Sequence, residues 1–249
     1  MIKSLILRRF WLWKNRLVPT IFLFFLLPFF CFTMISLPLK NIIRFSLAGD
    51  SYDVWNFHGL IFLIGSISLF PIIYRDFFDL RIHRKVLINI TLSPHSKLKL
   101  ILNSLIISIM ESVLVSIISC LVFISFIPIN FDFIKLIFMF ICLVMYLFII
   151  GNLYITISLI IDSFFLVTIA NTMLMIYIIF GIGFVIEFPF FPSGIEQILK
   201  LIPISFPFQI FQQFKSNGLT NFSMLSIIII LIYLWSLLNS KLLKFRLQQ

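Results

Sequence analysis

Long apolar stretches, separated by short polar or charged segments, dominate the pattern of this chain. A helix that crosses a bilayer needs about 20 consecutive apolar residues, because each residue adds about 1.5 Å and the hydrocarbon core is about 30 Å thick. Six stretches meet that requirement, so the pattern predicts an all-α, polytopic membrane protein. The predicted spans lie at about 17–37, 55–74, 98–128, 134–160, 163–186 and 219–241.

A shorter apolar segment, at about 190–215, separates the fifth and sixth predicted spans. Pro203, Pro207 and three glutamines interrupt it, and a proline inside a helix removes a backbone hydrogen bond. The segment is therefore too short and too interrupted to cross a membrane. We expect it to form short interfacial or re-entrant helices.

The first 16 residues combine basic and aromatic side chains. On a helical wheel, apolar residues from Ile2 to Leu17 fall on one side, with Arg9 and Arg16 at the edge of the apolar stripe. This pattern predicts a helix at 1–16 that lies in the membrane interface, where long basic side chains can reach the headgroups. The alternative is a basic segment that only orients the first span.

The segment at about 75–92 mixes charged and apolar side chains between the second and third predicted spans. Apolar residues recur at every fourth position from Phe78 to Ile90, which predicts a short amphipathic helix. Ser93 followed by Pro94 is typical of a helix N-terminus, because serine caps the first turn and proline has no N–H to leave unpaired there. The alternative is a solvated connector without a docking partner.

The composition agrees with a membrane protein. Of the 249 residues, 61% are hydrophobic and 11% are charged, with a mean hydropathy of +1.17, whereas about a quarter of residues are charged in soluble domains. A formal net charge of +10 would suggest nucleic-acid binding in a soluble protein. Membrane topology accounts for most of the basic residues, so no nucleic-acid partner is expected.

The positions of lysine and arginine predict the orientation of the spans, because cytoplasmic flanks carry an excess of both. One side carries 14 of the 19 basic residues, namely Lys3, Arg8, Arg9, Lys14, Arg16, Arg75, Arg81, Arg84, Lys85, Lys97, Lys99, Lys241, Lys244 and Arg246. The other side carries five, namely Lys40, Arg44, Lys135, Lys200 and Lys215. We therefore expect a protein integral to the cytoplasmic membrane, with both termini in the cytoplasm.

The sequence contains no motif for nucleotide binding, metal binding or covalent catalysis. None of the eight glycines stands in a G-x-x-x-x-G-K-[ST] context, so the chain is not expected to bind ATP by that route. The three cysteines lie apart in apolar runs, and the three histidines lack metal-ligand spacing. We expect no catalytic residue, no metal and no cofactor in this chain itself.

Glu111 is the most unusual residue, since a carboxylate near the middle of a span costs about 2.5–3.5 kcal/mol on insertion scales. It is expected either to face a polar pathway or to form a hydrogen bond between helices. Further polar atoms inside the predicted spans come from Asn103, Asn152 and Asn171.

Two local patterns resemble one protein family. Residues 92–96, Leu-Ser-Pro-His-Ser, resemble that family's hydroxyl-Pro-x-hydroxyl stretch at the start of the third span. Residues 191–205 resemble its extracellular segment, which ends in Pro-apolar-hydroxyl, here Pro203, Ile204 and Ser205. Together with the six spans, these patterns make the chain similar, over nearly its whole length, to the permease subunit of the ABC type-2 exporters.

The resemblance implies a permease that moves a lipid-linked glycan, a lipid, a drug or a hydrophobic peptide out of the cell. A separate ABC ATPase subunit would bind ATP and Mg, and a second permease copy would complete a homo- or heterodimer in membrane lipid. The helix between spans two and three would be the coupling helix that contacts the ATPase. Its contact residues would be Tyr74, Arg75, Asp76, Asp79, Arg81, His83, Arg84 and Lys85. Many members carry an acidic-x-Gly-Thr run there, which Asp79 and Leu80 replace in this chain.

Two other classes of function remain open from the sequence. A membrane-embedded enzyme acting on lipid could use Asp76, Asp79 and Glu111, because two carboxylates three residues apart share one helical face and can hold magnesium. Neighbouring arginines could instead neutralise both aspartates. A proton-coupled carrier could use Glu111 alone.

Overall fold

The computed structural model describes residues 2–15, 17–47, 49–87, 96–127, 132–218 and 221–247. Within these ranges the chain is nearly all helix and has no strand. Six helices in this described part are long and apolar enough to cross a membrane, which confirms the predicted number of spans. They are Leu17–Ile42, Tyr52–Ile82, Lys97–Phe126, Phe133–Ile160, Phe164–Gly181 and Phe222–Arg246.

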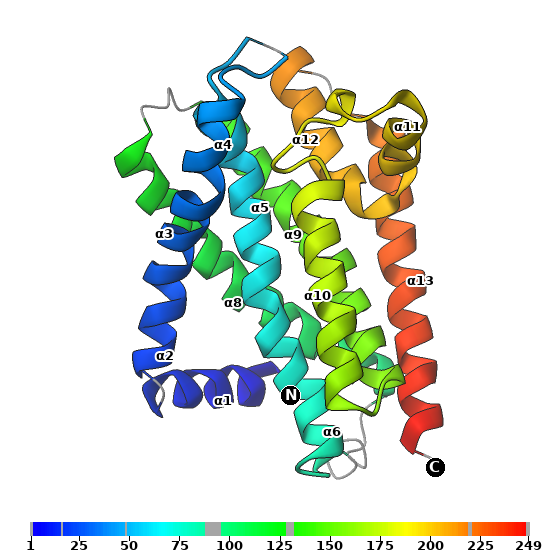
Figure 1. Ribbon diagram of the computed structural model, residues 1–249. Coiled ribbons are helices and arrows are strands. Elements are labelled where there is room, and N and C mark those ends of the chain that lie inside the picture. The colour runs from blue at the N-terminus through cyan, green and yellow to red at the C-terminus, as the bar shows by residue number, and fades with distance from the viewer. Residues whose placement is uncertain are drawn as a thin grey trace.

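The spans form one upright bundle (Figure 1). Its central helix is α5 (Tyr52–Ile73), which packs against α8 (Lys97–Phe126), α9 (Phe133–Ile160) and α10 (Phe164–Gly181). α9 in turn packs against α13 (Phe222–Leu247). Most of the α5 side chains are buried, as expected for a helix that neighbours cover on several sides.

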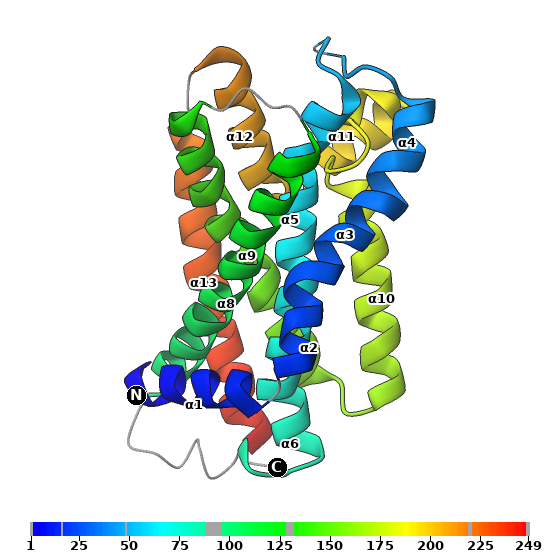
Figure 2. The same ribbon diagram turned by 90° about the vertical axis from the view of Figure 1, so that its left-hand side faces the viewer.

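The two ends of the bundle differ. α1 (Ile2–Asn15) lies across the spans at one end, where it packs against α8, and α6 (Leu80–Ile82) lies at the same end (Figure 2). Both termini of the described chain lie at this end, as an even number of spans requires. We call it the basic end, because the larger group of lysines and arginines belongs to it.

The first span contains two stretches of wider, π-helical turns, each shortly before a proline. Its successive segments are α2 (Leu17–Ile21), the π-helical η1 (Phe22–Leu26), α3 (Leu27–Cys31), the π-helical η2 (Phe32–Ser36) and α4 (Leu37–Ile42). Each π-helical segment contains the carbonyl that lies four residues before a proline, either Pro28 or Pro38. A proline ring clashes with that carbonyl in a regular α-helix, and a wider turn relieves the clash.

The second span is longer than predicted and includes residues 75–82 of the predicted coupling helix, whereas residues 88–92 lie outside the described residues. α5 continues through the π-helical η3 (Tyr74–Asp79) and α6 as far as Ile82. The chain then turns, and Lys85 has a left-handed φ of 52°. Phe78, which begins the four-residue period, is fully buried. Phe78 therefore lies on the inner face of a continuous extension of α5, whereas Val86 lies beyond this extension and is 39% exposed.

The third span begins at Lys97, and Ser96 is its N-cap. The Lys99 N–H donates a hydrogen bond to Ser96 Oγ over 3.3 Å, which satisfies one of the unpaired donors of the first turn. The cap predicted at Ser93 and Pro94 lies outside the described residues.

The fifth span ends earlier than predicted, at Gly181 rather than near residue 186. Gly183 has a φ of 85°, which glycine adopts without a steric penalty. The chain turns back here, and the carbonyl of Phe184 lies so close to Gly59 of α5 that no side chain fits between them. This turn joins the end of the fifth span to the central helix.

Short helices cover the end opposite α1. They are η4 (Phe188–Phe190), α11 (Ser193–Leu201), η5 (Pro203–Ser205) and α12 (Phe206–Asn217). α12 packs against α9, whereas α11 has no buried residue and lies on the outside. The segment predicted at 190–215 thus forms short helices at this end (Figure 1).

Candidate functional site

A buried set of charges joins α1 to the second and third spans at the basic end. Arg9 pairs with the carboxylate of Asp76, and Arg9 Nε lies 3.6 Å from Glu111 Oε2. Trp13 Nε1 donates a hydrogen bond to Glu111 Oε1 over 2.7 Å. The side chains of Arg9, Asp76 and Glu111 are only 9%, 11% and 15% exposed. We call the charged cluster the set Arg8, Arg9, Arg75, Asp76 and Glu111.

α1 supplies the positive charge that the two carboxylates require. Arg9 and Trp13 are four residues apart, so they lie on the same face of α1 and reach two helices at once. A carboxylate removed from water is costly unless a cation and hydrogen bonds compensate it. Two more arginines, Arg8 and Arg75, lie 3.7 Å and 3.6 Å from Asp76 Oδ1. The cluster therefore holds α1 against the bundle.

Glu111 thus bonds between helices, which was one of the two alternatives open from the sequence. Its partners on α1 were not predicted. A signal for them existed in Arg9, which lies at the edge of the apolar stripe of the first helix. A basic residue beside an apolar face needs an acidic partner wherever that face is buried.

Two of the residues predicted to contact an ATPase form ion pairs within this chain. Asp76 is buried in the charged cluster. Arg81 Nη1 lies 2.7 Å from Asp162 Oδ1, and its Nη2 donates a hydrogen bond to the carbonyl of Ile161 over 2.5 Å. Both side chains are engaged in contacts within this chain, and their contact with an ATPase stays a prediction. The contacts of Arg81 form because the extension of α5 packs against the loop between spans four and five.

Two further coupling candidates, Tyr74 and Arg75, also make contacts within the chain. Tyr74 stacks on Phe78 with ring centroids 5.0 Å apart. Arg75 belongs to the charged cluster and is mostly buried. Both residues lie in η3, inside the bundle's end rather than at its tip.

Beyond them, the chain presents a short basic surface at the end of the extension. Asp79 Oδ2 lies 2.9 Å from Arg84 Nε, and Asp79 Oδ1 lies 3.4 Å from His83 Nδ1. These contacts hold the turn after α6, while the outer parts of the side chains stay exposed. We call the exposed tip the set His83, Arg84 and Lys85. It is the part of the predicted coupling residues that a partner can reach.

The three asparagines predicted inside the spans do not form one polar path. Asn152 Oδ1 accepts hydrogen bonds from Ser236 Oγ and from Asn239 Nδ2, each over 3.1 Å, which ties α9 to α13. Asn171 Nδ2 donates only to the carbonyl of Val167 in its own helix. Asn103 is buried, and its Nδ2 has no hydrogen-bond partner among the described residues. Asn152 therefore holds two helices together.

We expect Asn239→Ala to lower the free energy of unfolding by about 1 kcal/mol, because buried hydrogen bonds between membrane helices contribute about 0.6 to 2 kcal/mol. Thermal unfolding in detergent measures the loss. Thr172→Ala is the matched control, since Thr172 Oγ1 is exposed and bonds only to the carbonyl of Thr168. Equal stability of the two variants would show that this contact between α9 and α13 contributes nothing.

Pro203 and Ser205, which resemble the family's extracellular motif, stabilise the bend between α11 and α12 at the end opposite α1. Pro203 begins η5, where its missing N–H leaves no unpaired donor. Ser205 is fully buried and donates to the carbonyl of Ile202 over 2.8 Å. Gln209 Nε2 donates to Ser205 Oγ over 2.7 Å, which fixes the start of α12.

A loop-to-loop contact lies at the same end. The Leu47 N–H donates to both carboxylate oxygens of Glu187, over 3.2 Å and 3.3 Å. Burial raises the pKa of Glu187 above its ordinary value, although the Leu47 N–H opposes this rise. The segment after span one is thereby attached to the segment after span five.

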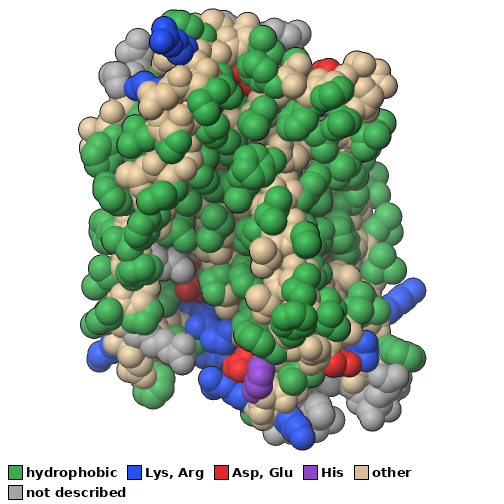
Figure 3. Space-filling view, in the orientation of Figure 1, with side chains coloured by type: hydrophobic (Ala, Val, Ile, Leu, Met, Phe, Trp, Pro, Cys, Tyr) green, Lys and Arg blue, Asp and Glu red, His purple; other side chains and the backbone are tan. Residues whose placement is uncertain are grey.

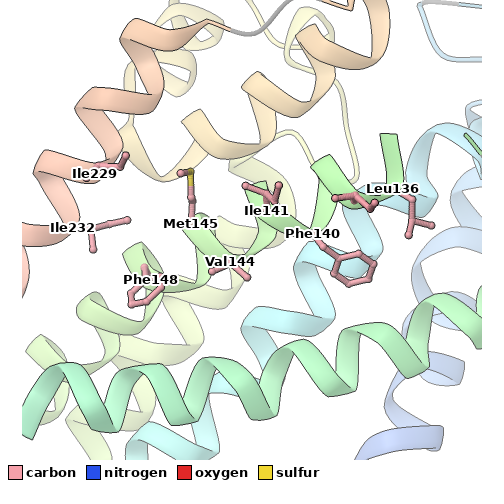
Figure 4. Close-up of a pocket in the computed structure, with 9 residues that line it drawn as sticks. Leu136, Phe140, Ile141, Val144, Met145, Phe148, Ile229 and Ile232 are labelled. Carbon is pink, nitrogen blue, oxygen red and sulfur yellow. The ribbon is translucent and has the colours of Figure 1, made fainter. Parts of the chain in front are cut away.

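An apolar cavity of about 590 Å³ lies between α9 and α13 (Figure 4). Phe140, Val144 and Met145 line it from α9, and Ile229 and Ile232 line it from α13. The walls offer no polar group for chemistry, so the cavity is a packing feature of an outward face.

Among the described residues, no three His, Cys, Asp or Glu side chains lie together as a metal site. The charged groups that do converge are the carboxylates and guanidiniums of the charged cluster. Comparisons with models of known protein families, with curated proteins and with solved structures found no match.

Proposed function

We propose that this chain is the transmembrane permease subunit of an ATP-driven ABC exporter. The observation that carries the proposal is a continuous helix, Tyr52–Ile82, that runs through the centre of the bundle and ends in the exposed tip. A separate ATPase subunit with ATP and Mg would bind this tip from the cytoplasm. The charge asymmetry that places the basic end in the cytoplasm supports this orientation.

The contacts around the tip support a role in transmitting motion. Arg81 ties the extension to Asp162, and Arg246 Nη1 lies 3.4 Å from the same carboxylate. Asp76 ties the extension to α1 through Arg9. A displacement of the tip would therefore move the central helix, α1 and the cytoplasmic ends of later spans together. Packed elements of this kind transmit small shifts because they are not freely deformable.

A second permease copy would complete the pathway, because six helices alone rarely enclose a channel for a large substrate. In this proposal the short helices at 190–215 are extracellular and partly re-entrant. The substrate class is a lipid-linked glycan, a lipid, a drug or a hydrophobic peptide. No observation favours the lipid enzyme or the proton-coupled carrier, since Glu111 and Asp76 are engaged with α1.

The proposal is tested by purifying the tagged chain from its native membrane in mild detergent. We expect an ATPase to co-purify in equal amount and to hydrolyse ATP. The double variant Arg84→Glu with Lys85→Glu should lose the ATPase while remaining in the membrane, because both side chains belong to the exposed tip.

The matched control reverses two charges elsewhere at the basic end, in Lys241→Glu with Lys244→Glu. Both lysines are exposed on the last turns of α13, so this variant should retain the ATPase. A chain that purifies alone, without nucleotide dependence, would overturn the proposed function. If the ATPase stays bound to the Arg84→Glu, Lys85→Glu variant, the exposed tip is not the surface that contacts it.

A further inference from the structure

A mostly apolar cavity of about 310 Å³, with charged groups at one side, lies between α1, the first span, the end of α5 and α8. Phe24, Pro71 and Val115 are among its apolar lining residues. Arg75, Arg84 and Glu111 are among its charged lining residues. Figure 3 shows basic and acidic side chains set back in the flank of the bundle, between apolar surfaces and above the basic end. Charged groups thus face a hollow in a side that is otherwise apolar.

Arg75 has unsatisfied donors at this cavity. Its Nε and Nη2 atoms are buried and have no hydrogen-bond partner among the described residues. The nearest carboxylate oxygen, Asp76 Oδ1, lies 3.6 Å from Arg75 Nε, which is too far for a hydrogen bond. A buried guanidinium with unpaired donors is costly, so the site lacks an acceptor. An anionic ligand with several oxygens would supply one.

The charge balance agrees with a ligand of negative charge. Arg84 is neutralised by Asp79 at 2.9 Å. The charged cluster then contains three arginines and two carboxylates, because Arg8, Arg9 and Arg75 share Asp76 and Glu111. The cluster therefore carries one positive charge in excess, and Arg75 is the member with buried, unpaired donors.

The shape and position of the cavity indicate an amphiphile rather than a soluble anion. A soluble phosphate ester would leave the apolar wall at Phe24 and Pro71 uncovered. An amphiphile would cover that wall with an acyl chain and gain about 25 cal/mol for each Å² of apolar surface. Basic pockets between membrane helices on the cytoplasmic side are suited to anionic lipid headgroups.

We propose that this cavity binds a membrane phospholipid with a negatively charged headgroup, whose phosphate accepts hydrogen bonds from Arg75. The acyl chain lies against Phe24 and Pro71. The bound lipid compensates the remaining charge of the cluster that holds α1. This site is independent of the exporter function, because it lies within one chain and requires no ATPase.

The test uses the purified full chain in lipid nanodiscs or detergent and compares phosphatidylglycerol with phosphatidylcholine. Native mass spectrometry counts bound lipids, and thermal unfolding at increasing lipid concentration gives the apparent affinity. We expect phosphatidylglycerol to bind at least about tenfold more tightly, because the choline group of phosphatidylcholine would place a second cation near Arg75 and leave the excess charge of the cluster uncompensated. Glycerol phosphate should not compete with it.

Substitutions test whether Arg75 binds the lipid headgroup. Arg75→Gln should remove the preference for phosphatidylglycerol. Arg75→Lys should keep part of it, because lysine retains the positive charge but lacks the planar set of guanidinium N–H donors. Lys3→Gln, which removes a positive charge from an exposed position on α1, should leave the preference unchanged.

Equal affinity of the unaltered chain for both lipids would overturn the proposal, and this result does not depend on whether any variant folds. Full competition by glycerol phosphate would overturn the lipid as the ligand in favour of a soluble phosphate. A preference that survives Arg75→Gln would overturn the assigned site.

Discussion

Replacing Arg9 with alanine is expected to lower the free energy of unfolding by about 3–5 kcal/mol, because it leaves two buried carboxylates without their shared cation. Asp76 and Glu111 come from different helices, and Arg9 contacts both. The loss should also release α1 from the bundle. Thermal unfolding in detergent measures the first effect, and faster tryptic cleavage within α1 measures the second.

Arg8→Ala is the matched control. Arg8 is the adjacent arginine and lies 3.7 Å from the same Asp76, but its side chain is 38% exposed. Exposed pairs contribute about 0–1 kcal/mol, so this variant should lose little. Arg9→Lys should fall between the two, because it keeps the charge but loses the planar fork of donors. If Arg9→Ala proves as stable as Arg8→Ala, the charged cluster does not hold α1.

The second large effect is expected for Gly59→Ala in the central helix. A Cβ atom at Gly59 would lie 2.0 Å from the carbonyl oxygen of Phe184 and 2.7 Å from its carbonyl carbon. These are backbone atoms of the turn after the fifth span, so rotating a side chain cannot relieve the clash. The turn or α5 must move, at a cost of about 3 kcal/mol or more. Thermal unfolding and the yield of monodisperse protein measure the effect.

Gly194→Ala is the control for a glycine-to-alanine change. No atom lies within 4 Å of the position that its Cβ would take. Alanine also favours helix over glycine by about 1 kcal/mol, so this variant of α11 should be equally or more stable. A destabilisation as large as that of Gly59→Ala would mean that the close contact with Phe184 is not the cause.

The two effects locate the parts of the chain that keep α5 in place. The charged cluster holds its basic end to α1, and the close contact at Gly59 holds its other half to the turn after α10. In the proposed exporter, a movement of the exposed tip is transmitted to the bundle through α5, which these two contacts hold in place. Variants that weaken either attachment, while the chain still binds an ATPase, would separate assembly from transport.

The sequence by itself determined the number and approximate place of the spans. Lipid-facing helices must satisfy every backbone hydrogen bond internally and cover about 30 Å with apolar side chains, so hydropathy is sufficient to find them. The same reasoning predicted short helices at 190–215, because prolines and glutamines prevent that segment from crossing.

The tertiary structure alone decided which polar residues meet. Arg9, Asp76 and Glu111 are far apart in the sequence, and no local pattern states that α1 lies across the second and third spans. The four-residue period beginning at Phe78 predicted a separate helix from residue 75, whereas α5 continues to Ile82, because a sequence period alone does not distinguish an extension of the preceding span from a new helix. Contacts such as Gly59 with Phe184 depend on distances between elements, and hydropathy along one chain does not contain those distances.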